Sequence, residues 1–154
     1  MRILNRREVE VFEAKIENIY GAKESLREFT VLLSGKEDKI WIANKELFQI
    51  PLEKLRVNSV GLYFGRIDGG KLRLSVEGAG IIGLKAEKNV VELDEAHLWD
   101  FLRGFDIELK EKVPETKEYV LVKHKNDFLG IAKLEGNTLK NALPKSRKIV
   151  SLTK

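Results

Sequence analysis

Short β-rich runs separated by turn residues recur along this 154-residue chain, and they limit its fold more than any other feature. The runs within residues 28–43 flank one turn and predict a hairpin. Those within residues 60–76 lie on either side of Asp68-Gly69-Gly70 and predict a second hairpin. Since few helical patterns come between the strands, the expected fold class is α+β.

The first helical pattern begins near the N-terminus. Asn5 and Glu8 have the spacing of a reciprocal capping box, and an amphipathic run follows them up to Gly21. These residues predict a helix over residues 6–20. Asn44 is expected to cap a short helical turn that ends near Phe48, ahead of a proline.

A second set of elements begins after Lys88. Asp94 is expected to cap a helix that closes at Gly104, and Pro144 confines the segment after the turn at residues 135–137 to an edge or a loop. The predicted strands are residues 90–93, 105–109, 119–122, 128–134 and 149–152. Short strands around one helix predict a small, partly closed barrel. We therefore divide the chain into an N-terminal α/β lobe, residues 1–82, and a barrel domain, residues 83–154.

The segment Gly78–Gly83 has the form G-x-G-x-x-G. A dinucleotide site needs this string between a strand and a full helix of a parallel β-α-β unit. Here the surroundings are hairpins, and the chain soon reaches Lys85–Asn89. We interpret the segment as a short helix or a glycine-rich turn whose glycines serve turns or packing.

Side chains suited to catalysis or metal binding are sparse. The chain has no cysteine, which excludes disulfides, thiolate zinc sites and a cysteine nucleophile. His97 and His124 have no third ligand at a suitable spacing and are interpreted as surface or capping residues. We expect no cofactor and no metal.

The N-terminus is charged early, and no run approaches the roughly 20 apolar residues of a membrane span. A cytoplasmic protein without membrane association is expected. One methionine, no cysteine and many Lys and Glu residues fit a heat-adapted composition.

Charge is distributed unevenly along the chain. Residues 117–154 hold nine basic and three acidic side chains, whereas residues 73–116 hold six basic and ten acidic ones. A positive face on a small fold is typical of a surface that binds phosphates, although a solvated face of a lysine-rich protein is the alternative. The acidic stretch is expected on the opposite side of the module. The basic candidates are Lys123, Lys125, Lys133, Lys140, Lys145, Arg147 and Lys148.

Several segments carry a family resemblance. They are VVELD (90–94), LWDFLRGFDI (98–107) and YVLVKHKNDFLGIAKL (119–134). Together they resemble a PUA domain, a small RNA-binding pseudo-barrel. Two further segments, LRLSVEGAGIIG (72–83) and LEGNTLKNALPKSRKI (134–149), are similar to the PUA-like tails of Sun-type rRNA cytosine-C5 methyltransferases. The whole chain also resembles two-domain, PUA-containing assembly factors of the large ribosomal subunit, with a comparable GLYFGRI-to-KLRLSV hairpin (61–76) before the PUA module.

The resemblance implies RNA binding by the end of the helix and by the adjoining strands. The matching positions are Arg103, Gly104 and the segment Gly130–Lys133. It does not carry over methyl transfer, because the chain lacks a cysteine nucleophile and room for an S-adenosylmethionine domain.

We therefore expect a non-catalytic protein that binds structured rRNA or tRNA in ribosome biogenesis or RNA modification. One alternative is an RNA-recognition subunit whose first lobe docks a separate rRNA cytosine methyltransferase or a ribosomal protein. The other is an enzyme acting on a nucleotide or RNA base, which would need a pocket with a histidine, an acid and a lysine.

Overall fold

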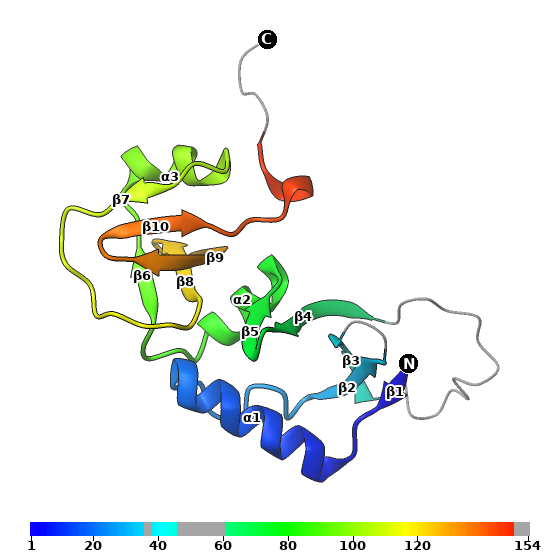
Figure 1. The fold of residues 1–154 in the computed structure, drawn as a ribbon. Coiled ribbons are helices and arrows are strands. Elements are labelled where there is room, and N and C mark those ends of the chain that lie inside the picture. The colour runs from blue at the N-terminus through cyan, green and yellow to red at the C-terminus, as the bar shows by residue number, and fades with distance from the viewer. Residues whose placement is uncertain (36–37, 46–60, 150–154) are drawn as a thin grey trace.

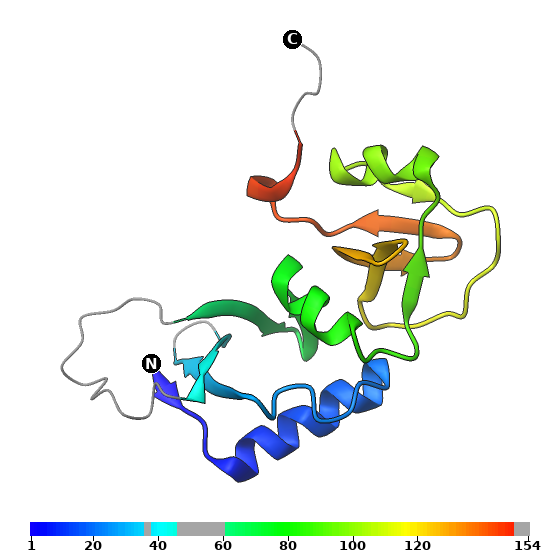
Figure 2. The same cartoon turned by 180° about the vertical axis from the view of Figure 1, so that it is seen from behind.

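Two five-stranded sheets form the framework of the computed structural model, which describes residues 1–35, 38–45 and 61–149 (Figure 1). In the first sheet the strand order is β1-β2-β3-β4-β5, and all neighbours are antiparallel. Its strands are β1 (Arg2–Ile3), β2 (Phe29–Ser34), β3 (Lys39–Asn44), β4 (Leu62–Asp68) and β5 (Lys71–Leu74). Seen from the front and from behind, helices α1 and α3 lie at opposite ends of the molecule (Figures 1 and 2).

Helix α1 (Arg6–Tyr20) follows the predicted bounds. The Asn5 side chain accepts a hydrogen bond from the Glu8 N–H at 2.9 Å, and the Glu8 carboxylate accepts one from the Asn5 N–H at 3.0 Å. Gly21 adopts φ 73° and donates its N–H to the Glu17 carbonyl, which ends the helix. The predicted capping box and glycine stop are both confirmed.

Both predicted hairpins are confirmed in the first sheet. The turn of the second hairpin places Gly69 and Gly70 at φ 58° and 81°, the left-handed region that a tight two-residue hairpin turn requires. The short strand β1 was not predicted. The predicted turn after Asn44 falls mostly on residues 46–48, outside the described residues.

The segment Gly78–Gly83 belongs to a short helix, α2 (Val76–Gly83), rather than to a glycine-rich turn. A Cβ added at Gly78 would overlap the Phe64 carbonyl oxygen of β4, and one at Gly83 would lie 2.5 Å from the Phe128 ring. These two glycines therefore let the helix approach both sheets closely, which confirms the packing interpretation.

One hydrophobic core spans the two sheets. Tyr20 and Phe64 from the first half pack with Ala79 and Ile82 of α2 and with Leu121 and Ile131 from the second half. The buried Tyr20 hydroxyl donates a hydrogen bond to the Tyr119 carbonyl at 2.7 Å. Burial of Tyr20 raises the pKa of its hydroxyl well above its ordinary value, so the group stays protonated as a donor. The halves are therefore joined by packing as well as by the chain.

The second sheet has the order β6-β8-β9-β10-β7. Its strands are β6 (Val90–Glu92), β7 (Ile107–Glu108), β8 (Val120–His124), β9 (Asp127–Glu135) and β10 (Thr138–Asn141). Strands β6 and β8 are parallel, and the other pairs are antiparallel. This open half-barrel confirms the α+β class and the small barrel.

Helix α3 (Glu95–Leu102) has Asp94 as its N-cap, as predicted. It buries Phe101 in a second core that fills the half-barrel. Among the described residues, no helix is both long and apolar enough to cross a membrane.

Two predictions for the end of the chain differ from the structure. Strand β10 pairs on both sides, with β9 and β7, so the prediction of an edge or loop before Pro144 is wrong. The proline lies beyond the strand and removes no hydrogen bond from it. Ile149 lies outside any strand, and the rest of the predicted last strand falls outside the described residues.

Candidate nucleic-acid interface

Two lysines face each other on the outside of the second sheet. Lys133 of β9 and Lys140 of β10 are direct cross-strand partners, and both are exposed. Opposite positions of an antiparallel pair project to the same face, where two like charges repel each other. Lys140 also lies 3.4 Å from the Asp106 carboxylate, which offsets part of that repulsion. The sheet thus presents two lysine side chains on one face of adjacent strands.

The end of α3 lies beside the 3-10 helix η3 (Lys145–Arg147). Gly104 adopts φ 95°, and a Cβ placed there would lie 2.6 Å from Cδ of Lys148. The Ile149 N–H also donates to the Leu102 carbonyl at 2.8 Å. The predicted Gly104 and Lys148 are therefore in contact, because the lysine stem crosses the space that the glycine leaves open. Arg103 is the C-cap residue of α3, and its guanidinium lies 3.9 Å from the Asp100 carboxylate.

Gly130 has a packing role that the sequence did not reveal. It is buried in β9 at φ 147°, and a Cβ there would lie 2.8 Å from Cδ2 of Leu143. The space beside this glycine is filled by the Leu143 side chain. Its assignment to RNA contact stays a prediction.

Lys123 and Lys125 lie at the other end of β9. Lys123 is 3.7 Å from the Glu92 carboxylate, and its ammonium lies 5.8 Å from the centre of the Phe128 ring. Lys125 occupies the exposed β8–β9 turn at φ 52°. Most of β9 separates this turn from Lys133, roughly 20 Å along an extended strand. The structure therefore divides the predicted residues into two groups.

The acidic and basic stretches are not segregated, contrary to expectation. Glu92, Asp106 and Glu77 of the acidic stretch pair with Lys123, Lys140 and Arg147, respectively. The prediction of an acidic face opposite the basic one is wrong, since the pairing of β6 with β8 and of β7 with β10, and the contact of α2 with η3, bring the two stretches together. Within the described part of the chain, Lys133 and Lys145 make no ion pair.

Asp106 connects the α3 end to β10. A hydrogen bond from the Asn141 N–H, 2.9 Å long, holds the pKa of the Asp106 carboxyl below its usual range, and the Lys140 ammonium adds to the effect. A carboxyl with a lowered pKa in the folded state stabilises the fold above its unfolded pKa of about 3.9. This contribution is lost as the pH falls through the lowered folded pKa.

We therefore expect Asp106→Asn to lose less stability than the wild type between about pH 6 and about pH 3. Urea unfolding midpoints measured at both pH values test this difference. Glu111→Gln, at an exposed position in a loop, serves as the control. An equal loss in wild type and Asp106→Asn would contradict the assignment.

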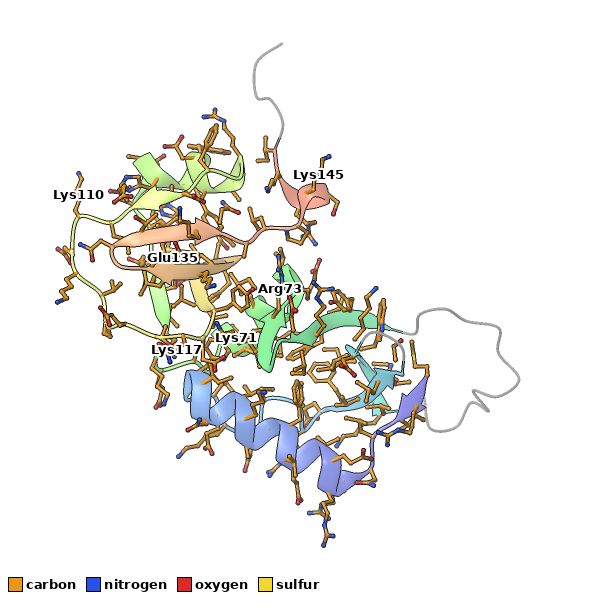
Figure 3. The ribbon with its side chains drawn as sticks, viewed as in Figure 1. Lys71, Arg73, Lys110, Lys117, Glu135 and Lys145 are labelled. Atoms are coloured by element: carbon orange, nitrogen blue, oxygen red, sulfur yellow. The ribbon has the colours of Figure 1, made fainter. Side chains whose placement is uncertain are left out.

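A cavity between the two halves was missed by the sequence analysis. It has a volume of about 400 Å³ and is lined by Tyr63, Arg66 and Arg73 of the β4–β5 hairpin, Glu77 of α2, and Pro144 and Arg147 near η3. Figure 3 shows Arg73 between the two sheets, below the segment that carries Lys145. The hairpin register follows from the Gly69-Gly70 turn, so the sequence contained the signal for the Arg66–Arg73 pairing.

A second cavity, of about 470 Å³, lies between β6, α3 and the chain after β7. Asp94, His97 and Lys110 line it. His97 Nδ1 is 3.0 Å from an Asp94 oxygen that also caps the helix, and His124 Nδ1 is 2.8 Å from the Leu93 carbonyl. His97 therefore has its partner at the N-cap of its own helix, whereas the partner of His124 lies 31 residues away in sequence. Among the described residues, no cluster of His, Asp and Glu is suited to a metal ion.

Comparison with protein families divides the chain at α2. Residues 1–76 match the model described as NIP7/UPF0113, pre-PUA domain. Residues 88–149 match the model described as Methyltransferase RsmF PUA domain.

Relatives include the ribosomal RNA small subunit methyltransferase F of several bacteria. The protein of Aeromonas salmonicida is 35% identical over 113 residues, which is 73% of this chain and 23% of that protein. That of Shewanella woodyi is 35% identical over 114 residues, 74% of this chain and 23% of that protein. The chain thus spans about a quarter of these relatives. Since residues 88–154 number only 67, the aligned 113 residues extend back into the first half.

Proposed function

We propose that this chain is a non-catalytic RNA-binding protein. The proposal proceeds from its matches to a pre-PUA domain of the NIP7/UPF0113 type and to a PUA domain of the RsmF methyltransferase type. Its target class is structured rRNA or tRNA, and its setting is ribosome biogenesis or RNA modification in the cytoplasm. The boundary between its domains is proposed at residues 82 and 83.

The observation that carries this proposal is the pairing of Lys133 with Lys140 beside the α3 end. Both lysine side chains project from the same face of adjacent strands, and the Lys148 stem crosses Gly104 nearby. Like charges held together on a folded surface bind a polyanion more strongly than dispersed ones do. RNA supplies phosphates at regular spacing, and each neutralised phosphate releases counterions.

The first test replaces Lys133, Lys140 and Lys145 together by alanine. We expect weaker binding to a fluorescein-labelled RNA hairpin with a single-stranded flank. The slope of log K against log salt should become shallower by about 0.7 to 0.9 for each phosphate that the variant no longer neutralises. Fluorescence anisotropy from about 50 mM to about 200 mM KCl measures both the affinity and the slope.

A matched variant replaces the exposed Lys23, Lys88 and Lys112, which removes the same charge from other surfaces. Its binding and salt slope should remain close to those of the wild type. Equal losses of affinity in the two variants would show that RNA binding depends only on net charge. The proposed surface would then be wrong.

An alternative role as a docking subunit is supported by the relatives. These relatives are rRNA methyltransferases by name, and the chain spans only about a quarter of their length. In this version the pre-PUA domain binds a separate rRNA cytosine methyltransferase or a ribosomal protein. Partner capture that persists after nuclease treatment would favour this role over RNA binding alone.

The enzyme alternative is supported by the cavity with Asp94, His97 and Lys110. The Asp94 carboxylate already caps α3 and contacts His97, which favours a structural role. Two measurements distinguish an enzyme from a non-catalytic protein: thermal unfolding with added nucleotides, and a screen for turnover of RNA bases. A non-catalytic protein should show no shift of the unfolding midpoint and no turnover.

A further inference from the structure

We propose that the cavity between the β4–β5 hairpin and η3 binds a backbone phosphate of the RNA, so that the pre-PUA and PUA domains both contact the same RNA strand. This inference rests on the proposed function and adds a second contact to the Lys133–Lys140 surface. It assigns RNA contact to a domain that carries little net charge of its own.

Three arginines and one glutamate are the charged residues among the described lining of the cavity, and Asp68, outside the lining, pairs with one of the arginines. The lining holds Arg66, Arg73 and Arg147 against Glu77, an excess of two positive charges. Arg66 and Arg73 are direct cross-strand partners, a like-charge arrangement that destabilises an empty hairpin. An anion between them removes this repulsion. Guanidinium groups are also suited to phosphate, because their planar donors bind two oxygens at once.

Arg73 is held toward the second domain. Its guanidinium carbon lies 5.7 Å from the centre of the Tyr119 ring, which belongs to the segment entering β8. The Arg66 guanidinium lies 3.5 Å from the Asp68 carboxylate, and the Arg66 side chain is 40% exposed. One arginine is therefore fixed by a ring from the other domain, while its partner remains accessible to a ligand.

Glu77 already occupies an anion position at the edge of the cavity. Its carboxylate accepts a hydrogen bond from Arg147. Burial is the largest single influence and raises the Glu77 pKa, but the hydrogen bond and charge of Arg147, together with a backbone hydrogen bond, hold the pKa below the ordinary value. The pair shows that an oxyanion fits beside Arg147. It also implies that a phosphate must compete with Glu77 for this arginine.

The walls of the cavity are fixed before any ligand arrives. The Ser75 hydroxyl donates to the Tyr63 carbonyl at 2.7 Å and accepts from the Gly78 N–H at 2.9 Å, which ties the hairpin to α2. Helix α2 belongs to the core that also holds Leu121 and Ile131 of the second sheet. A site on rigid walls loses little conformational entropy on binding.

The test combines two variants whose RNA affinities are expected to change in opposite directions. Arg66→Ala with Arg73→Ala should weaken binding of the labelled RNA hairpin about tenfold or more, since hydrogen bonds to charged groups are strong. Glu77→Gln should tighten binding several-fold, because it releases Arg147 and removes a competing charge. Arg6→Ala with Arg7→Ala, on α1, removes two charges elsewhere and should change little.

Thermal unfolding of each variant separates a fold defect from a binding defect. Unchanged RNA affinity in the Arg66/Arg73 variant, with the Lys133/Lys140/Lys145 variant impaired, would overturn this inference and leave the proposed function standing. No RNA binding by the wild type would overturn both. Pyrophosphate that displaces the RNA and stabilises the wild type as well as RNA does would mark a site for small anions, which also contradicts an RNA phosphate site.

Discussion

Replacing Gly78 by alanine is expected to destabilise the protein by about 3 kcal/mol, at the upper part of the range for overpacked cores. The added methyl group would overlap the Phe64 carbonyl oxygen, a backbone atom of β4 that cannot rotate away. Relief requires α2 to move away from the first sheet. That movement would also stretch the hydrogen bond between the Gly78 N–H and Ser75, at 2.9 Å.

Gly80 provides the control on the same helix. A Cβ at Gly80 meets nothing within 4 Å, so alanine there should stabilise the protein by about 0.5 to 1 kcal/mol through helix propensity. Urea unfolding of the two variants should therefore give opposite shifts of the midpoint. Two shifts of the same sign would show that α2 does not pack on β4 as described.

Replacing Phe101 by alanine should cost about 3 to 5 kcal/mol, and the loss of stability should reach both domains. Phe101 is fully buried in the core of the half-barrel, which is separate from the core that holds the first sheet. The shared core and the Tyr20–Tyr119 hydrogen bond couple the two halves. Weakening one half should therefore lower the unfolding midpoint of the whole chain.

The two tryptophans of the chain test this coupling, because each domain holds one. Trp41 lies on β3 and Trp99 on α3. Single-tryptophan variants, with the other residue changed to phenylalanine, report each half separately by fluorescence. Coincident transitions are expected, and Phe101→Ala should shift both equally. A midpoint that moves only for Trp99 would show independent domains.

Elements defined by near neighbours in sequence were predictable. The Asn5–Glu8 box, Gly21 and the Asp68-Gly69-Gly70 turn act over a few residues, and each one marks the element that the structure contains. The prediction of an edge or loop at β10 was wrong, and the reason is physical. The place of this strand between β9 and β7 depends on a strand some 30 residues earlier, and no local pattern records that pairing.

The candidate site was predictable only in part, for the same reason. Charge counting found Lys133, Lys140 and Lys148, but it placed the acids on another face. The distance in sequence between Arg73 and Arg147 hid the cavity that they share. A count of charges along a chain misses both the cancellation and the clustering of charges that arise from contacts between elements far apart in sequence.

Helix α2 has a consequence for how such proteins are divided and recombined. It lies almost wholly between the segments matched by the two family models, residues 1–76 and 88–149, yet it packs on both sheets. A fragment that begins after Gly83 would leave Leu121 and Ile131 without the apolar neighbours Ala79 and Ile82. The second sheet is therefore not an independent unit, because part of its core packing comes from α2, which also belongs to the core of the first sheet.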